Sequence, residues 1–119
     1  MFAITQLLTR AAQVNAQGLA TGDNDRHQTW SELLNKVRCF AGGLRKLGVD
    51  SDVCAAILAL NSDRYYEFMC AVPWAGGVFQ PINTRLAGPE VVYWLNDSEA
   101  EVLVIDAAFA PLVAQIKDQ

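Results

Sequence analysis

The chain has 119 residues, of which 52% are hydrophobic and 18% charged, and its nine Lys and Arg against thirteen Asp and Glu give a net charge of −4. This composition excludes intrinsic disorder, since disordered chains are poor in apolar residues, and the length predicts a single domain over residues 1–119. No stretch concentrates basic side chains. The sequence therefore lacks the basic stripe by which proteins neutralise nucleic-acid phosphates.

The first predicted element is an amphipathic helix near the N-terminus, because apolar residues recur at steps of three and four from Ile4 to Val14. Gly18 is placed to end it. The turn-forming residues 22–25 then separate two short segments, 19–21 and 26–30, which predicts a small hairpin.

A longer helix is predicted to begin at Trp30, because Thr29 and Glu32 have the spacing of a capping box. Gly48 supplies its left-handed cap. Its predicted core face carries seven apolar residues: Trp30, Leu33, Leu34, Val37, Ala41, Leu44 and Leu47.

From residue 53 onward the sequence alternates between strands and helices. Residues 53–60, 78–82 and 102–105 are predicted strands, and the first is apolar throughout, as expected for a parallel strand buried on both faces. The helix after the first strand is capped by the Asn61-Ser62-Asp63 segment, ends at Gly76-Gly77 and should be kinked or shortened by Pro73. Its predicted inward residues are Tyr65, Phe68, Met69 and Val72.

Two further helices complete the predicted alternation. The first starts at Gly88-Pro89-Glu90 and turns Val91, Val92 and Leu95 inward, and the second is capped by Asp106. The sequence thus predicts an α/β fold, in which a partial parallel sheet of about three strands lies between helices in three layers. The N-terminal helix and hairpin are additions to this sheet.

Neither the sequence motifs nor the residue spacings indicate an active site. The chain has no glycine-rich phosphate loop, no GxSxG nucleophile elbow and no HExxH zinc motif. The single histidine, His27, is interpreted as a solvated hairpin residue rather than part of a catalytic triad. We therefore predict no catalytic residue and no metal ligand in this chain.

The remaining reactive or aromatic side chains are interpreted as structural. Cys39, Cys54 and Cys70 lack the spacing of zinc ligands and are expected to be free thiols buried in the core. The carboxylate pairs Asp50/Asp52, Glu99/Glu101 and Asp23/Asp25 are expected in solvated loops. The aromatic residues Tyr65, Tyr66, Trp74 and Trp94 are expected to pack in the core.

The longest apolar run, residues 53–60, is far too short to cross a bilayer. The first seventeen residues also mix Thr, Gln and Arg with apolar side chains, unlike the core of a signal peptide. We therefore predict no membrane insertion and a cytoplasmic location.

Several motifs in a consistent order resemble the amino-terminal subdomain of the adenylate-forming (AMP-dependent synthetase/ligase) superfamily, closest to the acyl-CoA synthetases, or acid–CoA ligases. One departure from that pattern is Ser51-Asp52, where the family commonly has a Gly-Asp turn. The matching segments cover nearly the whole chain: Thr29-Trp30-Ser31-Glu32-Leu33, Gly42-Gly43-Leu44, Leu47-Gly48-Val49, Ala75-Gly76-Gly77-Val78, Pro81-Ile82-Asn83-Thr84-Arg85-Leu86 and Glu101-Val102-Leu103-Val104-Ile105-Asp106.

This resemblance implies an enzyme that forms an acyl-adenylate from a carboxylic acid and ATP, with Mg²⁺, and then transfers the acyl group to coenzyme A. The family's phosphate loop, adenine site, Mg²⁺-associated acid and catalytic lysine lie downstream of the matched region. We therefore expect the chain to be a truncated N-terminal portion of such a ligase, inactive alone. The resemblance implies one site residue, Arg85, which would contact the phosphates of CoA; the alternative is that Arg85 pairs with Glu90 or is merely solvated.

Two other functions stay open. The chain can be a stand-alone interaction module, forming a homo-oligomer through the apolar face that the rest of a ligase would cover. It can also be a small nucleotide-binding domain, whose ligand would lie at the carboxyl ends of the strands near Asn61, Asn83 and Asp106.

Overall fold

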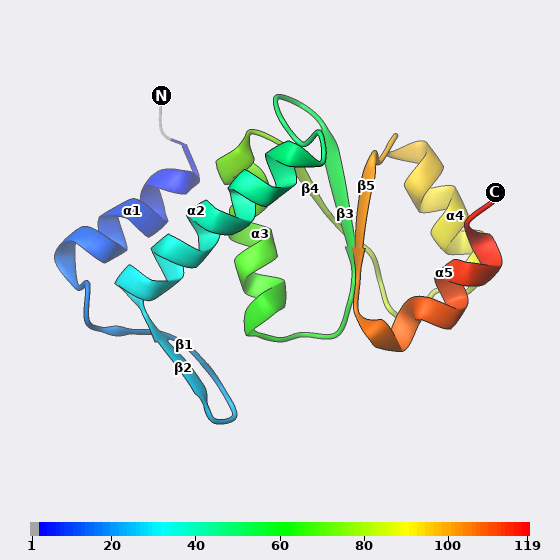
Figure 1. The fold of residues 1–119 in the computed structure, drawn as a ribbon. Helices are drawn as coiled ribbons and strands as arrows, with labels where there is room; N and C mark the ends of the chain where they lie inside the picture. The colour runs from blue at the N-terminus through cyan, green and yellow to red at the C-terminus, as the bar shows by residue number, and fades with distance from the viewer. Residues whose placement is uncertain (1–2) are drawn as a thin grey trace.

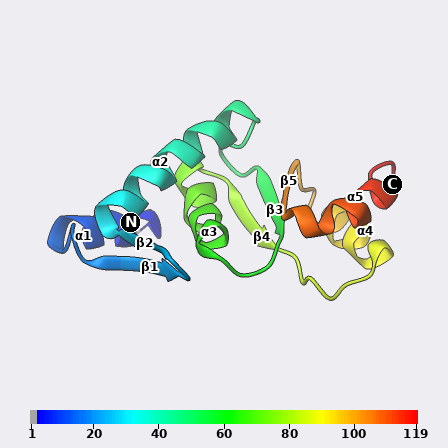
Figure 2. The same ribbon diagram turned by 60° about the horizontal axis from the view of Figure 1, so that its bottom comes forward.

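The structure, a computed structural model, describes residues 3–119 and consists of a three-stranded parallel sheet between two groups of helices (Figures 1 and 2). Helices α2 and α3 cover one face with α1 packed against them, and α4 and α5 cover the other. The predicted α/β fold is confirmed. The helices are α1 (Thr5–Val14), α2 (Trp30–Lys46), α3 (Asp63–Ala75), α4 (Gly88–Asp97) and α5 (Ala110–Ile116). The strands are β1 (Leu19–Asp23), β2 (Arg26–Thr29), β3 (Cys54–Leu58), β4 (Val78–Pro81) and β5 (Val102–Ile105).

The sheet has the strand order β4-β3-β5, so β3 lies in the centre and is buried at every position. Its side chains alternate between two core clusters, as the twofold repeat of a strand requires. Ala55 and Ile57 join the cluster formed with α1, α2 and α3, whereas Ala56 and Leu58 join the one formed with α4 and α5. The apolar run therefore reflects burial on both faces, as predicted.

Helix α2 begins with the predicted capping box. The backbone N–H of Glu32 donates to Thr29 Oγ1 at 3.2 Å, and that of Thr29 donates to Glu32 Oε2 at 2.8 Å. Gly48 has the predicted left-handed conformation, with φ of 96°. Leu47 was wrongly predicted to face the core: it is 66% exposed, because it lies at the C-cap, where the helical periodicity ends.

Helix α3 runs past Pro73 to Ala75 and ends at Gly76. The kink or shortening expected at Pro73 is limited, because proline there removes one hydrogen bond within the last turn. Phe68 and Val72 are fully buried as predicted, but Met69 is 37% exposed. The buried stripe instead includes Asp63 and Glu67, which contact the hairpin.

The β1–β2 hairpin is attached to α3 through two buried carboxylates one helical turn apart. Arg26 Nη2 donates to Asp63 Oδ1 at 2.8 Å, and Gln28 Nε2 donates to Glu67 Oε1 at 2.9 Å. The carboxylate of Asp23 adds a third link by accepting from the backbone N–H of Asp63 at 3.1 Å. We call these links the hairpin–α3 contact.

The C-terminal layer differs from the prediction at Asp106. The side chain of Asp106 forms no capping hydrogen bond, and a 3₁₀ turn, Ala107–Phe109, precedes α5. The cause is local. Helix α5 starts at Ala110, three residues later than a cap at Asp106 would place it, and has Pro111 in its first turn. The preceding helix α4 begins as predicted, with Pro89 in its first turn.

Within residues 3–119, no helix combines the length and the apolar character needed to span a membrane.

Candidate functional site

The carboxyl ends of β3 and β4 open into a cleft of about 460 Å³. We call it the sheet-edge cleft. It lies where open parallel sheets generally bind ligands, beyond the carboxyl ends of the strands. Its lining residues are Ala59, Leu60, Asn61, Tyr65, Pro81, Ile82, Asn83 and Thr84.

Strand geometry places the polar residues of the cleft. The backbone N–H of Ile82 still donates to the carbonyl of Ile57 at 3.0 Å, and the Ile82 side chain is buried. The next residue, Asn83, is therefore the first to leave the sheet, and it is exposed. Asn61 leaves β3 at the same edge, so both amides line one cleft.

Of the three residues predicted at the strand ends, two are brought together. Asn61 and Asn83 both line the cleft, whereas Asp106, at the end of β5, is not among the lining residues. The backbone N–H of Asp106 donates to the carbonyl of Leu58 at 3.0 Å, which continues the β3–β5 pairing. The site is thus formed by the β3–β4 half of the sheet.

Arg85 follows the cleft wall directly. The side chain of Asn83 accepts a hydrogen bond from the backbone N–H of Arg85 at 2.9 Å, which turns the chain outward. Arg85 is exposed, and among residues 3–119 no carboxylate forms an ion pair with its guanidinium. The alternative partner, Glu90, instead accepts from the backbone N–H of Ala87 at 2.8 Å.

Tyr65 also lines the cleft, although the sequence had assigned it to core packing. Its ring packs edge-on against Phe79 with centroids 6.3 Å apart, so its role is partly structural. Burial raises the pKa of Tyr65 above its ordinary value of 10.0, so the phenol is neutral at physiological pH. It can therefore offer the cleft an aromatic face and a hydroxyl group.

The other residues considered in the sequence are dispersed. His27 is exposed on β2, as predicted, and Cys54 is buried. Cys39 is exposed, which corrects its predicted burial, because it lies on the outer side of α2 beside the exposed Arg38. Trp94 is also wrongly predicted as core: it is 49% exposed on α4.

Asp23 is not simply solvated, since it belongs to the hairpin–α3 contact. Asp50, Asp52, Glu99 and Glu101 are exposed, as predicted. In the described part of the chain, no cluster of three or more His, Cys, Asp or Glu side chains is placed to hold a metal ion.

Comparison with known proteins identifies the family. Residues 8–119 match the AMP-binding enzyme family. The chain belongs to the AMP-binding enzymes. The resemblance inferred from the segments around Thr29, Gly42, Gly76 and Asn83 is thereby confirmed.

The related AMP-binding enzymes are acid–CoA ligases. The chain is 34% identical to the 3-methylmercaptopropionyl-CoA ligase of Ruegeria lacuscaerulensis, over 98% of this chain and 22% of that protein. It is 39% identical to the long-chain-fatty-acid–CoA ligase of Thermus thermophilus, over 85% of this chain and 18% of that protein. The chain thus spans about a fifth of the length of these relatives.

The fold of this AMP-binding enzyme also matches a solved structure. An inhibitor-bound crystal structure of the N-terminal domain of FACL13 from Mycobacterium tuberculosis superposes with a TM-score of 0.95 and 30% identity. The match covers all of this chain and 30% of that one. The sheet and both helical layers are therefore shared with an N-terminal domain of this family.

Proposed function

We propose that the chain is the N-terminal part of an ATP-dependent acid–CoA ligase, which forms an acyl-adenylate and then an acyl-CoA. The family match and the names of the related ligases support this proposal. In this role the chain contributes structure and one wall of the substrate-binding region. The observation that carries the proposal is the sheet-edge cleft followed by the exposed Arg85, with which no carboxylate of residues 3–119 forms an ion pair.

Arg85 would bind the phosphates of CoA. A guanidinium offers a planar set of N–H donors that form charge-assisted hydrogen bonds with phosphate oxygens. The Asn83 turn holds the backbone of Arg85 at the cleft, while its side chain is free of carboxylates within the described residues. The cleft and Arg85 together thus offer polar contacts and a positive charge.

The test of Arg85 separates the two half-reactions of the complete ligase. We expect Arg85→Gln to raise the KM for CoA about tenfold, as loss of a charge-assisted contact implies, and to leave ATP–pyrophosphate exchange unchanged. Arg10→Gln, an exposed change on α1, is the matched control. An unchanged KM for CoA would remove Arg85 from the proposed site.

The chain alone is expected to be inactive. The complete enzyme would also use ATP and Mg²⁺, and we assign their binding groups to other segments of such a ligase. The 119-residue chain should therefore show no ATP–pyrophosphate exchange with any carboxylic acid. Exchange above that of a chain-free control would contradict this expectation.

A second candidate function is a homo-oligomeric interaction module. It is favoured by exposed apolar side chains on β4 and α4: Val78 is 49% exposed, Tyr93 64% and Trp94 49%. Light scattering would then detect an oligomer that Tyr93→Ser and Trp94→Ser dissociate. A monomer at high concentration would count against it.

A third candidate is a nucleotide-binding domain that acts alone through the sheet-edge cleft. Calorimetry with ATP and with CoA tests it on the isolated chain: submillimolar affinity for either would support it, and weaker binding would count against it. A cytoplasmic location stays a prediction.

A further inference from the structure

Two buried side-chain oxygens of the β1–β2 hairpin have no hydrogen-bond partner among residues 3–119. They are Thr21 Oγ1 and Gln28 Oε1. Gln28 is only 3% exposed, so its amide is shielded from solvent. A buried polar group without a partner lowers the folding equilibrium constant by roughly fivefold to a hundredfold. Folded proteins therefore pair nearly all such groups, either with protein atoms or with ordered water.

The orientation of the Gln28 amide is fixed by Glu67 of α3. Gln28 Nε2 donates to Glu67 Oε1 at 2.9 Å. Because a carboxylate oxygen only accepts hydrogen bonds, the nitrogen of the amide has to face it. Turning the amide over would bring two acceptors together and lose this bond. The oxygen of Gln28 is therefore the atom that is left for another partner.

The pairing of the hairpin strands places Thr21 opposite Gln28. The two residues are Cα partners in the antiparallel ladder, and the register shifts between Leu19 and Thr21. Over this step β2 advances only from Thr29 to Gln28, so β1 contains one extra residue, which is a β-bulge. Directly opposed residues extend their side chains from the same face, with Cβ atoms about 4.5–5.5 Å apart.

A single water molecule matches this pair of oxygens. At about 2.8 Å for each O–H···O bond, one water links two oxygens that are up to about 5.5 Å apart. It would donate one proton to Gln28 Oε1, which can only accept, and would donate to or accept from the hydroxyl group of Thr21. A buried water typically has two to four such polar partners.

A metal cation fits the same place less well. Hard cations take six or more oxygen ligands, whereas Thr21 and Gln28 offer one each. Positive charge is also already present, because Lys36 Nζ lies 3.8 Å from Glu67 Oε1. The two oxygens therefore favour a small neutral molecule that can both donate and accept hydrogen bonds.

We propose that one water molecule is bound between Thr21 Oγ1 and Gln28 Oε1, and that it links the two hairpin strands beside the hairpin–α3 contact. Neither residue lines the sheet-edge cleft. The proposal does not depend on the function proposed for that cleft.

The first experiment counts long-lived waters in the 119-residue chain. Oxygen-17 magnetic relaxation dispersion follows the water molecule itself rather than its exchangeable protons. We expect the count to fall by one in Thr21→Val, which removes the hydroxyl group and keeps the branched shape of the side chain. Thr21→Ser is the matched control, because it keeps the hydroxyl group and should keep the water. A count that is the same in Thr21→Val as in the unaltered chain would overturn the proposal.

Urea denaturation then tests whether the hydroxyl group of Thr21 has a partner. If a water bridges the two oxygens, Thr21→Val loses a hydrogen bond and the folding equilibrium constant should fall about fivefold. An unpaired hydroxyl group predicts the opposite, since removing a buried polar group without a partner stabilises the chain. An unchanged or larger folding equilibrium constant would therefore overturn the proposal.

A double-mutant cycle tests whether the two oxygens share one water. Gln28→Met removes the amide and keeps roughly the length of the side chain. Because it also removes the bond to Glu67, the informative quantity is the effect of Thr21→Val in the Gln28→Met background. We expect that effect to be less than twofold, against about fivefold in the unaltered chain. An equal loss in both backgrounds would mean that the oxygens are independent.

Two further outcomes would overturn the proposal. The first is coupling between Thr21 and Gln28 without the loss of a long-lived water, because the two side chains would then bond to each other directly. The second is an unfolding midpoint that KCl raises and an equal concentration of tetramethylammonium chloride does not, because a metal cation would then occupy the site.

Discussion

The carboxylate of Asp23 links the hairpin turn to the start of α3. It accepts a hydrogen bond from the backbone N–H of Asp63 at 3.1 Å and forms an ion pair with Arg26 at 3.2 Å. The hydrogen bond from the Asp63 backbone, followed by that from Arg26, holds the pKa of Asp23 below its ordinary value of 3.8. Both contacts are stronger with the ionised carboxylate than with the neutral acid.

The first prediction is a pH dependence carried by Asp23. Because its pKa is lower in the folded chain than in the unfolded one, its stabilising effect is present above pH 3.8 and is lost as the pH falls through the folded value. Asp23→Asn should therefore lower the unfolding midpoint at pH 7, and the difference from the unaltered chain should shrink below pH 3.8. Urea unfolding from pH 7 to pH 2.5 measures it. Asp25→Asn, at the same turn, is the control. If its effect on stability depended equally on pH, Asp23 would not be the residue that causes the pH dependence.

The second prediction concerns two glycines with opposite surroundings. A Cβ added at Gly77 would lie 2.6 Å from Val49 Cγ1 and 2.9 Å from the carbonyl oxygen of Val53, whereas one at Gly42 would have no neighbour within 4 Å among residues 3–119 outside its own turn of α2. Gly77→Ala should therefore destabilise the chain by about 1–3 kcal/mol. Gly42→Ala should stabilise it by about 0.5–1 kcal/mol, because it restricts the unfolded backbone. Chemical denaturation measures both, and changes of the same sign would refute this account.

Among whole elements, the starts of α2 and α4 form a natural comparison. Thr29 and Ala87 are both N-caps with nearly the same extended backbone, at φ −78° and ψ 165° for Thr29 and φ −75° and ψ 163° for Ala87. Each backbone N–H donates to a glutamate three residues later. Only Thr29 has a side-chain oxygen that returns a hydrogen bond.

The third prediction follows from this difference. Thr29→Ala should cost about 1 kcal/mol of stability, because it removes the side-chain half of a capping box. Ala87→Ser should add up to about 1 kcal/mol, because it supplies the missing half where the backbone already has the required geometry. Thermal unfolding measures both changes. If Ala87→Ser destabilised the chain, the new hydroxyl group would not be accepting the hydrogen bond from the backbone N–H of Glu90 that completes a capping box.

Helix and strand order could be predicted from the sequence because caps, glycines and periodicity are local signals. The errors lie where tertiary contacts decide. Leu47 and Met69 continue an apolar pattern yet are 66% and 37% exposed, which the spacing of apolar residues alone does not reveal. The hairpin–α3 contact joins residues 37 to 40 positions apart, so no local spacing predicts it. At the site, Asn61 and Asn83 could be predicted from the strand ends, but the contribution of Tyr65 depends on how α3 packs.

In the whole molecule, the two faces of the sheet are covered unequally. The cluster with α1, α2 and α3 contains twelve buried residues, and the one with α4 and α5 contains five. Helix α5 has seven residues, of which only Ile116 is buried. Local stability follows the number of buried apolar contacts, so the C-terminal layer is expected to be the less stable one.

The fourth prediction is that amides of α4 and α5 exchange with solvent before those of α2 and α3. Native-state hydrogen exchange measures this directly. Val72→Ala and Val91→Ala provide a matched pair, since both side chains are fully buried in opposite clusters. Val72→Ala should speed exchange throughout, and Val91→Ala mainly in α4 and α5. Uniform protection would show that the two layers unfold together.

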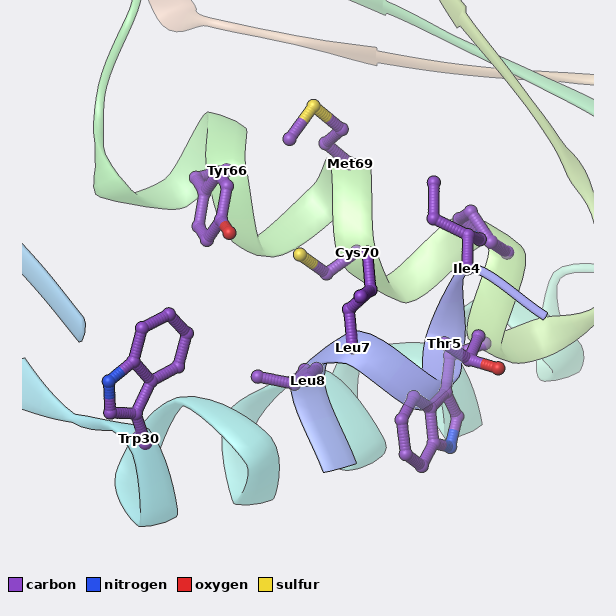
Figure 3. Close-up of a pocket in the computed structure, with 10 residues that line it drawn as sticks. Ile4, Thr5, Leu7, Leu8, Trp30, Tyr66, Met69 and Cys70 are labelled. Atoms are coloured by element: carbon purple, nitrogen blue, oxygen red, sulfur yellow. The ribbon is translucent and has the colours of Figure 1, made fainter. Parts of the chain in front are cut away.

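Two consecutive tyrosines of helix α3 line different cavities. Tyr65 lines the sheet-edge cleft, and Tyr66 lines a second cavity, formed by residues of α1, α2 and α3 (Figure 3). Adjacent side chains on a helix are about 100° apart around its axis, so a rotation of α3 about that axis would displace both rings in the same movement. The shape of one cavity therefore cannot be altered by turning this helix without altering the other. A substitution that changes ligand preference at either cavity by reorienting α3 will be felt on both sides of the helix.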